Sequence, residues 1–292
     1  MPVSYTLFFI VVFCIFLFVT FPGEAIKNRI VNEISRNSHY LTEIERASIS
    51  PVNNINMDRV MVYKSRHRVL DFDSVSIKIP ILGLFSETPK IPFIAKKGDG
   101  VIRGYVRVNK NTGDISEISA KLESVRIDSL PAFLTRLDGE QELVQLQGVM
   151  DGELHVDVAP VPDGEFHFVI NAIHVDNLKF NEMALPALSG LTAQVTGTIE
   201  ENATNIEQFN VRGEGLDFPA SGKAPLLWEL SRGGGLLDLE YRFEVNGGQL
   251  AKFMPFLSGS PYLAKQRDGS LGGKVLGTVK NPQFEKSSVK RF

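Results

Sequence analysis

Long stretches of this chain alternate between apolar and polar side chains. The clearest stretch runs from Leu237 to Asn246, where Leu, Leu, Tyr, Phe and Val are separated by charged residues and closed by Asn. Successive side chains of a β-strand point to opposite faces, so a period of two predicts a strand with one apolar and one hydrated face. An α-helix would instead need apolar residues at a period of 3.6.

The same alternation recurs from Tyr40 onward, for example over 74–81, 154–158 and 191–199. Runs rich in Gly, Asn, Asp and Pro separate these segments at short intervals, as turns between strands require. We expect about a dozen strands and almost no helix beyond residue 38. The sequence therefore predicts a mostly β fold built as an antiparallel sheet.

Two parts of the sequence follow a common pattern. Residues 126–134 and 249–257 are apolar, contain Pro and follow a strand, and each leads to Asp-Gly and a Gly-rich strand, over 148–159 and 267–279. Such repeats indicate a sheet extended by similar units. Gly within strands marks bulges or sharp coiling, so we expect a strongly curved sheet, either a trough or an incomplete barrel.

An apolar stretch at the N-terminus, Val3–Phe21, carries no charged side chain. As a helix it would be about 28 Å long, close to the roughly 30 Å hydrocarbon core of a bilayer. A cleaved signal peptide would need a basic start and a small-x-small site, and no Lys or Arg precedes Lys27. We predict a single transmembrane anchor, with a cleaved signal and a buried core helix as alternatives. The anchor residues are Leu7, Phe8, Phe9, Ile10, Val11, Val12, Phe13, Ile15, Phe16, Leu17, Phe18 and Val19.

An amphipathic helix is predicted directly after the anchor, over 24–38. Its apolar stripe consists of Ile26, Ile30, Val31 and Ile34. The stripe either packs onto the start of the β-rich body, which we favour, or lies on the membrane surface. The predicted organisation is an anchor over 3–21, a helix or linker over 22–38, a β-rich domain over 39–284 and a flexible tail over 285–292.

The charge distribution argues against a nucleic-acid partner. The net charge is −3, and the small basic group Lys286, Lys290 and Arg291 lies in the tail. Binding to nucleic acid needs clustered Lys and Arg. The single cysteine, Cys14, lies within the predicted anchor, so no intrachain disulfide can form.

Few residue patterns point to a metal site. His155 and Asp157, and likewise His174 and Asp176, place an imidazole and a carboxylate on one face of a strand, and His167 lies near them in the sequence. We interpret these as polar side chains that face water. No metal site is therefore predicted.

Catalytic patterns are also weak. Asp71 and Asp73 have the spacing of a carboxylate pair, and we interpret them as solvated strand residues. Gly272-Gly273-Lys274 lacks the earlier Gly and the following Ser or Thr of a phosphate-binding loop. Trp228 is interpreted as a core aromatic rather than a partner anchor. We therefore predict no enzyme, no catalytic residue and no cofactor.

Two segments resemble a known family. FPGEAIKNRIVNEI follows the apolar N-terminus, and LLDLEYRFEVNGGQLAKFMPFL is followed by DGSLGGKVLGTVKNPQF near the C-terminus. Both are similar to GspN, the N protein of the bacterial type II secretion system, in its Leptospira and deltaproteobacterial branch. The closing segment, 269–282, is also similar to AsmA-like proteins, whose curved sheets carry apolar grooves.

The resemblance implies a single-pass inner-membrane protein with its body in the periplasm. It further implies a non-enzymatic accessory or scaffold role in type II secretion, beside other secretion subunits. The charges after the anchor instead weakly favour a cytoplasmic body. They are Lys27, Arg29 and Arg36, offset by Glu24 and Glu33. We follow the resemblance because these charges partly cancel, although the chain lacks a basic N-terminal stub.

Lipid handling is an alternative function, in which an apolar groove holds the acyl chains of phospholipid. The residues of this candidate groove are Phe166, Phe168, Ile170, Leu237, Leu239, Tyr241, Phe243 and Val245. An ordinary closed core is the favoured interpretation of the same residues. An outer-membrane barrel is a third alternative because the chain ends in Phe292, but Ser288 and Lys290 interrupt the required alternation.

Overall fold

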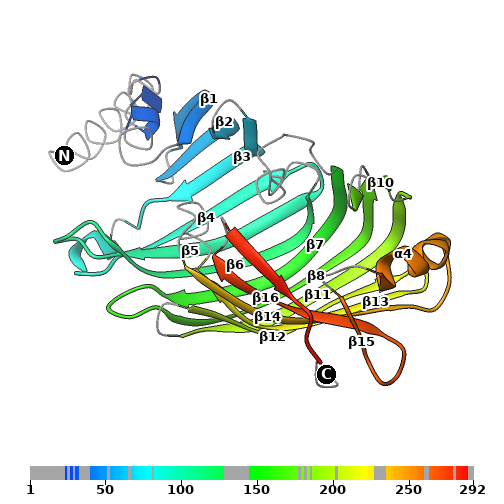
Figure 1. Ribbon diagram of the computed structural model, residues 1–292. Coiled ribbons are helices and arrows are strands. Elements are labelled where there is room, and N and C mark those ends of the chain that lie inside the picture. The colour runs from blue at the N-terminus through cyan, green and yellow to red at the C-terminus, as the bar shows by residue number, and fades with distance from the viewer. Residues whose placement is uncertain are drawn as a thin grey trace, which may run out of the picture. The chain divides into compact units, whose positions relative to one another are not determined.

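The computed structural model divides the chain into two compact units, Met1–Ile115 and Ser116–Phe292. Figure 1 shows the arrangement of strands within each unit. The described residues are 24, 27–28, 30–32, 40–50, 53–64, 67–80, 82–127, 145–176, 179–180, 183–184, 186–200, 203–226, 235–259, 263–278 and 281–288. The predicted anchor and Trp228 lie outside them. Among these residues, no helix has both the length and the apolar character needed to cross a membrane.

The first unit is an antiparallel sheet whose strands pair in chain order. A short 3-10 helix, η1 (Leu82–Phe85), separates its third and fourth strands. The strands are β1 (Tyr40–Ile49), β2 (Asn54–Lys64), β3 (His67–Lys78), β4 (Lys90–Lys97) and β5 (Gly100–Val108).

The predicted amphipathic helix packs against this sheet. Its described residues between 24 and 32 are helical, and Ile30 and Val31 contact a buried cluster on β1 and β2. Lys27 Nζ donates a hydrogen bond of 3.2 Å to the carbonyl oxygen of Glu45. The packing interpretation is therefore confirmed for the described part of this helix. The buried cluster consists of Ile44, Ala47, Met57 and Val60.

The described part of the second unit contains ten strands paired in one sheet, again antiparallel, in the order β6-β7-β8-β11-β12-β13-β14-β16-β15, with β17 on β16. Within the described part, β6 and β15 are not paired with each other, so this sheet is open. The bounds are β6 (Ile115–Arg126), β7 (Gln145–Asp157), β8 (Asp163–Asp176), β11 (Leu188–Glu200), β12 (Ala203–Gly213), β13 (Leu216–Pro225), β14 (Leu236–Val245), β15 (Ala264–Lys265), β16 (Leu271–Thr278) and β17 (Asn281–Glu285).

In the described part of the second unit, four short elements lie outside this sheet. β9 (Lys179–Phe180) and β10 (Met183–Ala184) pair with each other. The apolar segment after β14 forms η3 (Gln249–Phe253) and α4 (Met254–Ser258). Pro255 lies in the first turn of α4, where its missing N–H leaves no helical hydrogen bond unmade.

The alternation predicted from the sequence is present in the burial of the strands. On β7, Glu153, His155 and Asp157 are exposed, whereas Leu154 is half-buried and Val156 is buried. The mostly β, antiparallel fold is therefore confirmed. We call the side of the second sheet that carries Leu154 and Val156 the apolar face, and the opposite side the hydrated face.

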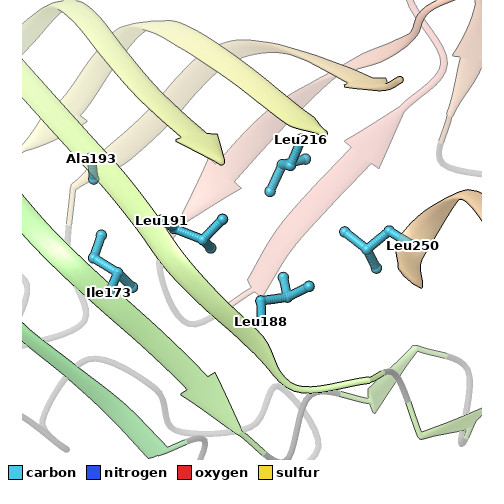
Figure 2. Packing of buried hydrophobic residues seen from close by; sticks show 6 residues of the cluster. All are labelled: Ile173, Leu188, Leu191, Ala193, Leu216 and Leu250. Carbon is cyan, nitrogen blue, oxygen red and sulfur yellow. The ribbon is translucent and has the colours of Figure 1, made fainter. Parts of the chain in front are cut away.

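Buried side chains on the apolar face gather in two clusters near opposite ends of the strands. Figure 2 shows the first cluster, where residues of β8, β11, β13 and η3 point towards one another. Leu191 is only 2% exposed, and burial of such a side chain contributes roughly 1.5–3 kcal/mol. The first cluster consists of Ile173, Leu188, Leu191, Ala193, Leu216 and Leu250. The second consists of Val156, Ile199 and Leu226.

Candidate functional site

Between the two clusters, apolar side chains lie opposite one another in rows that cross the strands. Directly opposed residues of an antiparallel pair share a face and have adjacent side chains. One row consists of Phe168, Val195, Phe209, Ala220 and Tyr241. The next consists of Phe166, Gly197, Ile206, Gly222, Leu239 and Val275.

A β-bulge in β12 keeps these two rows on the same face. Its register with β13 shifts between Ile206 and Phe209, so both side chains point to the apolar face although three positions separate them. Glu207 and Gln208, inside the bulge, are exposed. Bulges commonly re-aim side chains in this way.

Several apolar residues in the middle of the apolar face are less buried than the clusters at its ends, although Tyr241 is buried there. Phe168, Val195 and Phe209 are half-buried, as are Leu239 and Val275. The clusters at the strand ends, by contrast, are made of side chains that are less than a tenth exposed. The face therefore presents a band of apolar surface between two packed ends.

The eight predicted groove residues divide between these two environments. Ile170, Phe243 and Val245 pack against the first cluster, and Phe166 packs against the second. Tyr241 is buried, and this burial raises the pKa of its hydroxyl above the ordinary value. The remaining three, Phe168, Leu237 and Leu239, are half-buried and belong to none of the described clusters.

Aromatic rings cover glycines on the neighbouring strands. A Cβ atom on Gly197 would lie 2.7 Å from Cζ of Phe166, and one on Gly152 would collide with Phe168 and with the backbone of His167. These glycines leave the space in which the rings lie over the adjacent backbone. The centroids of Phe166 and Phe168 are 6.0 Å apart.

Among the described residues of the hydrated face, the guanidinium of Arg242 is buried. Arg242 is 6% exposed, and its Nε donates a hydrogen bond of 2.8 Å to Ser270 Oγ. Its Nη2 lies 2.9 Å from Glu244 Oε1 and also contacts Asp268. Ser270 Oγ donates in turn to Asp268 at 2.7 Å. The turn before β16 therefore closes over the guanidinium.

A polar pocket of about 480 Å³ lies beside Arg242, on β12, β13 and β14. Asn210 lines it and is 7% exposed. No described residue makes a hydrogen bond to Asn210 Oδ1. Arg212 and Asp217, also in the lining, pair with each other at 3.3 Å.

The structure gives His174 and Asp176 partners within the sheet. His174 Nε2 lies 2.7 Å from Asp176 Oδ2, and His174 Nδ1 lies 2.7 Å from Ser189 Oγ. Hydrolytic triads use these residue types, but Ser189 is exposed and the His174 side chain is 35% exposed. The register of β11 with β8 shifts between Leu188 and Leu191. We therefore interpret the three side chains as polar contacts that connect the two strands at this bulge.

Asp71 and Asp73 are likewise held by neighbouring residues of the first unit. Lys97 Nζ lies 2.6 Å from Asp71 Oδ1, and the backbone N–H of Gly98 donates a hydrogen bond of 2.7 Å to Asp73 Oδ2. These contacts tie β3 to the turn after β4. The carboxylates thus have a structural role that the sequence did not indicate.

His155 and Asp157 meet a third ligand-type residue that sequence reasoning missed. Glu117 on β6 lies directly opposite Asp157, and its Oε1 is 3.8 Å from His155 Nδ1. His167 lies on the same face, one strand away, opposite Glu153. The missing signal was strand register, because Glu117 is far from His155 in the sequence.

Comparisons with family models, with curated proteins and with solved structures find no match for this chain. Its function is therefore argued from the geometry described above. The similarity to GspN stays a prediction made from the sequence.

Proposed function

We propose that this chain is a non-enzymatic, membrane-anchored protein whose second unit binds the acyl chains of phospholipids on its apolar face. The observation that supports this most directly is the half-buried band of apolar rows between two fully packed ends. In an ordinary closed core, mid-strand residues would be buried at least as well as those at the strand ends. Here Phe168, Phe209 and Leu239 are less buried than the residues of the two clusters, although Tyr241 in the middle of the face is buried.

The energetics favour an apolar occupant of this band. Apolar surface removed from water contributes about 25 cal/mol per Å², and a buried methylene group of an acyl chain contributes about 0.8 kcal/mol. The described strands of the second unit are long and bent in Figure 1. In this proposal the sheet is a strongly curved, AsmA-like trough with the apolar face on its inner side.

A second proposal places the protein in type II secretion, as an accessory or scaffold component of the inner membrane with its body in the periplasm. The sequence similarity to GspN supports this role. The contacts of Ile30 and Val31 with the sheet of the first unit also favour the scaffold role. A helix packed on the body would hold that body in a fixed position beside the membrane, as a scaffold requires.

The experiment for lipid binding introduces a charge on the apolar face with Leu239→Glu. The full chain is purified gently from its membrane, and the phospholipid that accompanies it is quantified by mass spectrometry. We expect the variant to lose most of its lipid while it keeps a cooperative thermal transition, because Leu239 is half-buried and outside the packed clusters. An acyl chain that covered the new carboxylate would remove its charge from water, and this desolvation is strongly unfavourable.

The matched control is Asp238→Asn on the adjacent position of β14, which is exposed on the hydrated face. This variant should keep both its lipid and its stability. Unfolding of Leu239→Glu with loss of the thermal transition would instead identify a closed core. Wild-type protein that carries no phospholipid at all would overturn the lipid proposal.

A further inference from the structure

Four carboxylates lie directly opposite one another across the hydrated face. Glu117 on β6 is opposite Asp157 on β7, and Asp157 is opposite Asp163 on β8. Asp163 is in turn opposite Glu200 on β11. Like charges in directly opposed positions destabilise a sheet. This row concentrates negative charge on one part of the hydrated face.

An imidazole lies beside the row. His155 is two residues from Asp157 on the same face of β7, and Glu165 of β8 lies opposite it. The ligand atoms of Glu117, His155 and Asp157 all lie within 4.8 Å of one another. The Glu117 side chain is 14% exposed and the His155 side chain 47%.

We propose that Glu117, His155 and Asp157 bind one divalent transition-metal ion, for which Zn²⁺ is the representative. The ligand set combines one imidazole nitrogen with two carboxylates. Zn²⁺ accepts such ligands at about 2.0–2.2 Å in a tetrahedral arrangement. Small rotations of the exposed His155 and Asp157 side chains bring three ligand atoms to that spacing around one ion.

The donor set also predicts which cations bind poorly. Ca²⁺ and Mg²⁺ prefer oxygen ligands only, and Mg²⁺ requires a nearly ideal octahedron. An imidazole in the set favours Zn²⁺, Cu²⁺ or Ni²⁺ instead. Three protein ligands leave at least one coordination position for water or for a side chain of another molecule.

The surrounding charges attract a cation to this position. Asp163 and Glu165 add two carboxylates next to the three ligands. Lys121, on the same face, pairs with Glu153 at 3.5 Å, four residues from Asp157 along β7. The site is on the face opposite to the apolar rows, so this proposal does not depend on lipid binding.

Titration calorimetry of the full, untagged chain with Zn²⁺, after treatment with a chelator, tests the site. We expect one ion per chain with an affinity at least about tenfold tighter than that for Ca²⁺. The His155→Ala variant should lose at least about tenfold in Zn²⁺ affinity, and Asp157→Asn should weaken it as well.

The matched control is His167→Ala, which removes an exposed imidazole from the same face, one strand away. It should leave the Zn²⁺ affinity unchanged. Co²⁺ in place of Zn²⁺ gives a second readout, because its visible spectrum reports ligand number and geometry. Equal Zn²⁺ affinities for wild type and His155→Ala, equal losses in the two histidine variants, or binding only at millimolar Zn²⁺ would each overturn the proposal.

Discussion

Arg242 shows how a single residue departs from its strand pattern. The alternation of β14 places it on the hydrated face, where a charged side chain is expected to be exposed, yet it is 6% exposed. The cause is the turn before β16, which brings Asp268 and Ser270 onto the guanidinium. Local periodicity cannot predict this contact, because it depends on where a later part of the chain returns to the sheet.

Replacement of Arg242 should therefore destabilise the second unit. Removal of one partner from a buried ion pair costs about 3–5 kcal/mol. Glu244 and Asp268 are 35% and 39% exposed, so we expect a smaller loss of about 2–3 kcal/mol in the free energy of unfolding of Arg242→Ala. Urea denaturation measures this difference.

The control for that variant is Arg212→Ala. Arg212 also pairs with a carboxylate on the hydrated face, but its side chain is 68% exposed. An exposed pair contributes about 0–1 kcal/mol. If both arginine variants lost the same stability, the burial of Arg242 would have no energetic consequence, and the argument above would fail.

At the scale of the strand, a period of two is a local signal and the register between strands is not. Alternation alone predicted β7, β11 and β14 and identified which face of each is apolar. It could not show that Glu117 lies opposite Asp157, because the two belong to different strands and each has an ordinary polar position within its own. The sequence therefore pointed to the pair on β7 but not to Glu117, and it predicted no metal site.

The glycines beneath the aromatic rings give a prediction at the same scale. A Cβ atom at Gly152 would collide with the ring and backbone of Phe168 and with the carbonyl oxygen of His167. Gly152→Ala should thus separate β7 from β8 or displace the ring, at a cost of about 1–3 kcal/mol in the free energy of unfolding. Thermal denaturation of the full chain measures the loss.

Gly247 provides the comparison for this substitution. It lies in the turn after β14, and a Cβ atom there would have no atom within 4 Å. Gly247→Ala should change stability by no more than about 0.5 kcal/mol. A Gly152→Ala protein that melts like the Gly247→Ala protein would show that the rings do not need the glycines.

For the whole molecule, the sequence predicted the fold class but not the division into two units after Ile115. The turn before that residue, over 109–114, resembles the other turns in composition, and alternating segments lie on both sides of it. The partial burial of residues at the centre of the apolar face could not be predicted either, since burial depends on which elements cover a face. The eight candidate groove residues could be assigned to one face, but not to a packed or an open part of it.

Native mass spectrometry of the full chain, extracted gently from its own membrane, tests both proposed functions at this scale. Lipid binding predicts a stoichiometric phospholipid adduct that Leu239→Glu removes. A scaffold role in secretion predicts that other secretion subunits are isolated with the chain and are retained by Leu239→Glu. If neither adducts nor subunits were found, both proposals would be rejected.

The rings that lie over glycines also determine which side chains form the surface of the apolar face. Phe166 covers the position of Gly197, so the aromatic ring lies where a side chain of β11 would otherwise stand. Apolar contact is non-directional, so contact with these rings would not fix the position of an acyl chain along the strands. An acyl chain held there would be free to slide, which suits a conduit better than a storage site.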